Sequence, residues 1–127
     1  MSPERGTPDR RTLVFVADEG EVADLVQAAQ VSAGAVDAVI LDRGDEGLDE
    51  LQDAVYDGTV GRIILPSLEL LGPDLMAQEM ILAGWLEKGI AVFSLKEPDL
   101  GVDDPARRDA RGVLGEIDDY GKIPWVP

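Results

Sequence analysis

Short apolar runs alternate with amphipathic stretches along most of the chain. Four runs are short and rich in β-branched residues, which favours strands that are buried on both faces of a sheet. They span residues 12–17, 36–41, 62–65 and 90–95. Elsewhere apolar residues recur at helical spacing, and the expected helices span residues 21–33, 48–57, 72–88 and 106–120.

Glycine and proline mark where these helices begin and end. Gly34 ends the first helix and Gly89 the third, because glycine adopts the left-handed conformation that is common at helix carboxyl ends. Pro73 suits the first turn of the third helix, and Asp74 suits the positive end of its dipole. The residues of the third helix expected to face the core are Leu75, Met76, Met80, Leu82, Ala83 and Leu86, with Trp85 in the core or at its edge.

Strands and helices alternate four times, which predicts the fold class. Helical crossovers join parallel strands, and the resulting sheet is covered on both faces. We therefore expect a single α/β domain with a mostly parallel sheet of four or five strands and helices on both faces. A length of 127 residues suits one domain. The expected boundaries are a flexible leader over residues 1–11, the domain over 12–120 and a C-terminal tail over 121–127.

Composition narrows the possible chemistry. The chain holds no cysteine and no histidine, which excludes a disulfide scaffold, a thiolate nucleophile, a zinc site of the usual type and a histidine general base. With 26 acidic and 11 basic residues its formal charge is −15, so no nucleic-acid partner is expected. No apolar run reaches the roughly 20 residues that span a bilayer, and no signal peptide opens the chain. We expect a cytoplasmic protein with no membrane contact.

Three carboxylates are candidates for a metal site. Asp18 and Glu19 follow the first expected strand and Asp42 follows the second, and ligands of open α/β sheets bind outside the carboxyl ends of strands. The segment VDAVILD resembles the phospho-acceptor strand of response-regulator receiver domains, and FVADE resembles their acidic pocket, which implies Mg²⁺. The single crossover between Asp18 and Asp42 is too short for the receiver arrangement. Solvated acids at strand ends are the simpler interpretation, so no metal or cofactor is expected.

A second resemblance covers about residues 12–120. The segments GTVGRIILPSLELLGPDL, LEKGIAVFSLKEPDL and DDPARRDARGVLGEIDDY resemble, in order, the catalytic domain of serine recombinases of the resolvase/invertase family. Residues 89–97 match the family's strand Gly-Ile-x-Val-x-Ser-Leu-x-Glu, and residues 68–73 fall on its Leu-Asp-Arg-Leu-Gly-Arg segment. The resemblance implies a resolvase-like α/β fold.

The catalytic residues of that family are mostly replaced in this chain. Serine recombinases use a serine hydroxyl to attack a DNA phosphate and arginines to stabilise the charge that develops. In this alignment Gly20 stands at the position of the serine and Asp18 at that of an arginine. Leu70 and Pro73 stand at two further arginine positions, and only Arg108 would fill another.

These replacements predict a degenerate relative that has lost its activity. Residues 12–30 contain no serine, and Glu69 keeps the family's carboxylate but cannot transfer a phosphoryl group unaided. Each missing donor removes roughly 3–4 kcal/mol of transition-state stabilisation. We therefore expect a catalytically inactive domain that acts through protein contacts and is not an enzyme. A cleft that brought together a serine and two or more arginines would contradict this prediction.

The last expected helix carries an apolar stripe of Ala110, Val113, Leu114 and Ile117. The corresponding helix of serine recombinases forms their dimer interface, so the resemblance implies a protein partner or self-association through Val113, Leu114 and Ile117. The alternative is that the stripe packs on its own sheet.

Two further alternatives concern function. Residues 18–57 hold twelve acidic residues and one basic residue, a formal charge of −11. This segment is either a solvated surface or an acidic face that binds a basic protein or imitates DNA. The alternative function of a different class is a domain that binds a small ligand or Mg²⁺ through its acidic pocket.

Overall fold

The computed structural model describes residues 10–42 and 46–121, with side chains up to Gly115. Its strands are β1 (Arg11–Val16), β2 (Ala38–Leu41), β3 (Val60–Leu65) and β4 (Ala91–Ser94). Its α-helices are α1 (Val22–Ala28), α2 (Glu46–Tyr56), α3 (Leu75–Glu87) and α4 (Pro105–Gly121). Short 3-10 turns lie at Glu19–Glu21, Ala33–Ala35 and Leu68–Leu71.

The four strands form one parallel sheet in the order β2-β1-β3-β4. The predicted α/β class and the parallel sheet are confirmed. In the central strand, Leu13 lies beside Ala38 of β2 and Ile63 of β3. The chain leaves β1 toward β2 on one side and then returns to β3 on the other. The carboxyl ends of β1 and β3 therefore flank the point where the strand order reverses, which is where ligands bind in such sheets.

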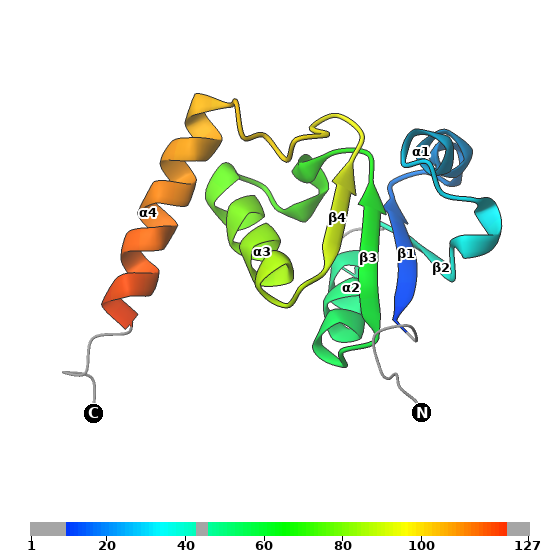
Figure 1. The fold of residues 1–127 in the computed structure, drawn as a ribbon, viewed down its shortest axis with the longest axis horizontal. Coiled ribbons are helices and arrows are strands. Elements are labelled where there is room, and N and C mark those ends of the chain that lie inside the picture. Colours follow the sequence, from blue (N-terminus) through cyan, green and yellow to red (C-terminus); the bar gives the residue numbers. More distant parts are fainter. Residues whose placement is uncertain (1–9, 43–45, 122–127) are drawn as a thin grey trace.

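Helices cover both faces of the sheet (Figure 1), as predicted. The larger core lies between the sheet and helices α2 and α3, and includes Phe15, Leu51 and Trp85. The smaller core lies under α1 and includes Val14 and Leu25. Helix α4 contacts α3 and stands outside it, on the side away from β4 (Figure 1). The alternative in which the last helix packs on the sheet is therefore wrong for the described part of the chain.

Helix α1 is shorter than predicted and ends at Ala28 instead of residue 33. Gln30 adopts a left-handed conformation with φ 61°. Its N–H donates to the carbonyl of Gln27, and the N–H of Val31 donates to that of Val26. These two bonds form a Schellman motif, which satisfies the last carbonyls of the helix and redirects the chain. Gln30 therefore ends helix α1, whereas the sequence pattern predicted that Gly34 would end it.

Helix α3 buries a different face from the predicted one. Met80, Ala83 and Leu86 are exposed, whereas Gln78 and Glu79 are buried. Leu82 and Trp85 are buried as expected. Because apolar residues occupy nearly all sides of this helix, their spacing does not define one inward face.

The start of α3 also differs. Asp74 is the N-cap, its carboxylate accepting from the N–H of Ala77 at 2.8 Å, so Pro73 lies before the helix and not in its first turn.

The predicted domain limits need small corrections at both ends. Arg11, which was assigned to the leader, is the first residue of β1, and its N–H donates to the carbonyl of Thr59 at 2.7 Å. Helix α4 includes Gly121, which was assigned to the tail. Residues 1–9 and 122–127, the rest of the predicted leader and tail, lie outside the described residues. Within the described ranges no helix has both the length and the apolar character to cross a membrane.

Candidate functional site

The acidic turn after β1 has a structural task of its own. The carboxylate of Asp18 accepts from the N–H of Gly20 at 3.0 Å, and the carboxylate of Glu21 accepts from the N–H of Asp18 at 3.2 Å. This reciprocal pair is a capping box, which satisfies N–H groups that would have no partner at a helix start. Asp18 therefore begins the helical turn that leads into α1.

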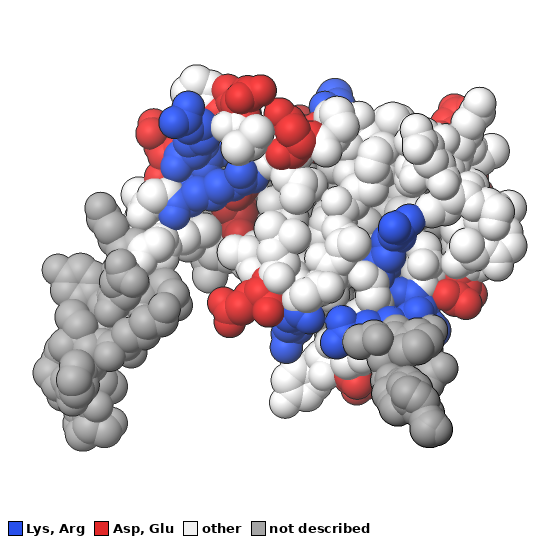
Figure 2. All heavy atoms as spheres, in the orientation of Figure 1, with Lys and Arg blue, Asp and Glu red and all other residues white. Residues whose placement is uncertain are grey.

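The three predicted metal ligands are not brought together. Asp18 and Glu19 are exposed, and Asp42 is half-buried at the end of β2. Across residues 10–42 and 46–121 no three acidic side chains are grouped closely enough to hold a metal ion. On the face drawn in Figure 2, acidic side chains likewise lie in several separate groups.

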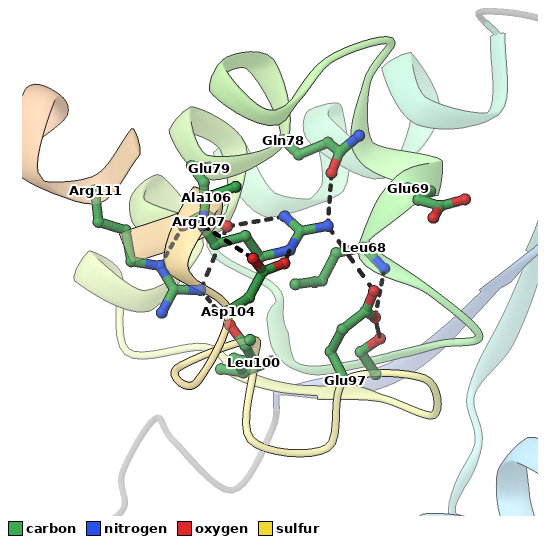
Figure 3. Close-up of polar contacts among 12 residues, drawn as sticks. Leu68, Glu69, Gln78, Glu79, Glu97, Leu100, Asp104, Ala106, Arg107 and Arg111 are labelled. Carbon is green, nitrogen blue, oxygen red and sulfur yellow. Dashed lines mark hydrogen bonds and ion pairs between the residues drawn. The ribbon is translucent and has the colours of Figure 1, made fainter. Parts of the chain in front are cut away.

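The positions that align with recombinase catalytic residues are also dispersed. Gly20 is exposed, and Leu70 packs against the larger core. Pro73 and Arg108 are exposed. The carboxylate of Glu69 is exposed and points away from the neighbouring polar residues (Figure 3).

A connected set of charges lies instead between α3, α4 and the loop after β4. We call Glu79, Glu97, Arg107 and Arg111 the buried charge cluster. Arg107 is only 4% exposed and Glu79 2%. The guanidinium of Arg107 donates to the Glu79 carboxylate at 3.0 Å and to the side-chain carbonyl of Gln78 at 2.8 Å. Because an unpaired buried charge is strongly unfavourable, these partners are needed for Arg107 to be buried.

Glu97 connects the cluster to the carboxyl ends of the strands. Its carboxylate accepts from the Ser94 hydroxyl at 2.6 Å, from the Leu68 N–H at 3.1 Å and from the Ser67 hydroxyl at 3.4 Å. Arg107 lies 3.8 Å from the same carboxylate. One side chain thus joins the loops after β3 and β4 to α4 (Figure 3).

Arg111 and Gly101 complete the attachment of α4. Arg111 donates to the Glu79 carboxylate and to the carbonyl of Leu100. Gly101 has φ 73°, and a Cβ there would lie 2.5 Å from the side chain of Arg107. Glycine is therefore required both by the backbone conformation and by the close approach of the arginine.

The cluster brings serines and arginines together around two carboxylates. The hydroxyls of Ser67 and Ser94 donate to the carboxylate of Glu97, and Arg107 forms an ion pair with it. Arg111 forms an ion pair with Glu79. Ser94 is 0% exposed. Glu79, Glu97 and Asp104 face the two arginines, so the cluster has no net positive charge to attract a phosphate. The absence of catalytic activity therefore stays a prediction.

The sequence prediction missed Glu79 as a site residue. A signal was present, because Gln78 and Glu79 are the only polar side chains between Leu75 and Leu86 of an otherwise apolar helix. Two adjacent polar residues in such a helix favour a buried polar contact with another element. Which element provides the partners depends on where α4 lies.

The apolar stripe of α4 is divided between two environments. Ala110 is buried and Leu114 is half-buried against α3, whereas Val113 is 44% exposed. The side chain of Ile117 lies outside the described ones. A groove of about 460 Å³ separates α3 from α4, and its lining includes Met80, Ala83 and Leu114.

Comparisons of this chain with models of protein families, with curated proteins and with solved structures found no match. The resemblance to serine recombinases therefore stays a prediction, which rests on the residues quoted for it. The receiver-like alternative stays a prediction as well, although its three carboxylates lie apart.

Proposed function

We propose that this domain acts by protein–protein contact, through self-association along α4, and that it cleaves no DNA. The observation that carries the proposal is the placement of α4. Among the described side chains, Arg107, Ala110 and Arg111 hold this helix to the body, Leu114 is half-buried, and Val113 is exposed to solvent. A helix that packs on α3 and exposes an apolar side chain such as Val113 suits an interface.

The charges along α4 support a second copy as its partner. Arg108 is exposed in the amino-terminal half, while Glu116, Asp118 and Asp119 stand in the carboxyl-terminal half of the sequence of this helix. Two antiparallel copies would place Arg108 of each copy, which has the exposed Asp109 beside it, opposite the acidic half of the other copy. A twofold contact has this reciprocal form, in which residue i meets residue j and residue j meets residue i.

The state of the arginines supports the absence of DNA chemistry. Phosphoryl transfer needs cations that face the reacting phosphate. Arg107 and Arg111 are instead committed to Glu79. A scaffold of recombinase type would thus keep its fold, while Arg107 and Arg111 attach α4 to α3 instead of facing a phosphate.

Sedimentation over a wide range of protein concentration tests self-association. We expect a monomer–dimer equilibrium that shifts toward monomer in Val113→Asp. The matched control is Val39→Asp on β2, where the valine is 42% exposed against 44% for Val113. Equal effects of the two substitutions, or a wild-type monomer throughout, would contradict the role of α4.

Incubation with duplex DNA tests the absence of chemistry. A denaturing gel should show no covalent protein–DNA adduct, and the protein should not be retained on DNA even at low salt. An adduct would overturn the proposal.

A further inference from the structure

Four cationic residues stand at or near the amino-terminal edge of the sheet in this acidic molecule. Arg10 and Lys88 line one pocket there, whereas Arg62 lines a separate space beside Ala29 at the end of α1. Arg10 and Arg11 stand at the start of β1, Arg62 near the start of β3, and Lys88 between α3 and β4. Parallel strands place their amino ends at the same edge of the sheet, so residues far apart in the sequence meet there. All four are exposed. We call them the basic edge, and Figure 2 shows Lys and Arg side chains gathered along the lower margin of the molecule.

The geometry of Arg10 shows how this edge is built. A Cβ at Gly61 would lie 2.7 Å from the Cβ of Arg10, so glycine in β3 lets the arginine lie across the strand. A Cβ at Gly89 would lie 3.8 Å from Nη1 of Arg10, which places the guanidinium at the carboxyl end of α3. Within residues 10–42 and 46–115, none of the four cations forms an ion pair.

A pocket of about 210 Å³ opens beside these cations. Its lining combines Arg10 and Lys88 with the apolar side chains of Val60 and Ile90 and the ring of Tyr56. Tyr56 is 84% exposed, which is unusual for so large an apolar ring.

The pocket continues into a groove between α2 and α3. Val55, Tyr56 and Lys88 line both spaces. The groove has about 410 Å³, and its floor includes Trp85, whose indole N–H donates to the side chain of Gln52 at 2.7 Å. Among the described residues that line the two spaces there is no carboxylate. In a chain with 26 acidic residues, this makes the groove a distinct surface.

We propose that the basic edge and this groove bind a short acidic segment of a partner protein. Apolar side chains of the segment would occupy the groove beside Tyr56, and its carboxylates would meet Arg10 and Lys88. Charge complementarity of this kind supplies specificity and faster association. This is a second surface, distinct from the α4 contact proposed above.

The surroundings of the basic edge favour a short segment over a long polyanion. Three exposed acidic residues lie near the basic edge. Glu87 precedes Lys88 in the sequence, Asp57 follows Tyr56, and the carboxylate of Asp37 accepts from the Thr12 N–H in β1 at 2.7 Å. A nucleic acid or an anionic membrane would extend past four cations onto this acidic surround, where a chain of formal charge −15 repels it. A peptide can remain within the basic edge.

Fluorescence anisotropy with a short labelled peptide of alternating Glu and Leu pairs tests the proposal. We expect saturable binding to the wild-type chain that weakens with salt, because the charges are exposed. The double variant R10E/K88E should bind at least about tenfold more weakly, since two favourable charge pairs become unfavourable. The matched control is Lys96→Glu, an exposed lysine after the carboxyl end of β4, which should change the affinity by less than about twofold.

Comparison ligands distinguish the other occupants. The same peptide with Gln in place of Glu should lose binding, and Tyr56→Ala should weaken binding of the acidic peptide. Tighter binding of duplex DNA or of phosphatidylserine vesicles than of the peptide would overturn the proposal, and so would equal effects of R10E/K88E and K96E. Val113→Asp should leave peptide binding unchanged. Failure of this proposal and failure of self-association through α4 are therefore separate results.

Discussion

Carboxylates occupy two very different places in this molecule. The turn after β1 presents Asp18 and Glu19 to solvent, and their contacts are local. The buried charge cluster holds Glu79 and Glu97 among donors from three separate segments of the chain. Exposed charges are well hydrated and contribute little to stability, whereas buried ones depend on every partner.

The comparison shows that a position at the carboxyl end of a strand is not enough to make a binding site, because the surrounding side chains must also converge on it. The acidic turn lies where ligands of α/β sheets bind, but its neighbours do not form a site with it. The buried charge cluster has the connectivity of a site, but its central pair, Glu79 and Arg107, is buried, and the cluster attaches α4 to α3. A dense polar network is thus used here to hold an interaction helix in place.

Removing the cation at the centre of the buried charge cluster should have the largest effect. Arg107→Met keeps the length of the side chain but leaves Glu79 and Glu97 with Arg111 as the one cation of the cluster. We expect a loss of about 3 kcal/mol in the free energy of unfolding, measured by urea denaturation. Arg108→Met removes an exposed arginine from the neighbouring position and should change stability by no more than about 0.5 kcal/mol. Similar values for the two variants would show that the cluster contributes no more than a surface charge.

A smaller loss is expected when one donor to Glu97 is removed. Ser94→Ala deletes the hydroxyl that donates to this partly buried carboxylate at 2.6 Å. Hydrogen bonds to charged groups contribute about 2 kcal/mol, so the urea midpoint should fall accordingly. Ser32→Ala is the control, since Ser32 is exposed and makes no capping hydrogen bond. If the two serine variants unfold at the same urea concentration, Glu97 does not depend on Ser94.

In the acidic turn, only substitution of the capping residue Asp18 should lower the free energy of unfolding. Asp18→Ala removes the side chain that accepts from Gly20 and should cost about 1 kcal/mol. Glu19→Ala removes the same charge without a cap, so its thermal unfolding should stay close to that of the wild type. An equal loss in both variants would mean that charge, not capping, determines the effect.

Magnesium should have the smallest effect of all. A bound ligand stabilises the folded state by mass action, but Asp18, Glu19 and Asp42 lie apart. We expect MgCl₂ to raise the melting temperature equally in the wild type and in the triple variant D18N/E19Q/D42N. Asn can still cap the turn, so the variant should fold. A larger rise in the wild type would restore the metal site as an interpretation.

Several features of the fold could be predicted because their cause is local. Short β-rich runs and helical spacing identified all four strands and all four α-helices of the described chain, with differences of a few residues at their ends. The end of α1 was predicted wrongly because Gln30 adopts a conformation that glycine usually takes. The inner face of α3 was predicted wrongly because apolar residues surround that helix.

The candidate sites were harder to predict, since they combine distant segments. Glu79 is separated from Arg107 by 28 positions and from Arg111 by 32, and nothing in the local pattern of either helix selects these pairs. The basic edge likewise joins residues 10 and 88, which meet only because the strands are parallel and in the order β2-β1-β3-β4.

The alternation of strand and helix periods was sufficient to determine the α/β class and the parallel sheet, because the burial of apolar faces is a property of short windows of sequence. The acidic character followed from composition, because net charge is a simple sum over residues. The tertiary structure alone decided which charges are buried, which helix is left without a place on the sheet and which cations share an edge. These outcomes depend on Coulomb and packing interactions between residues that only the folded chain brings within a few ångströms of one another.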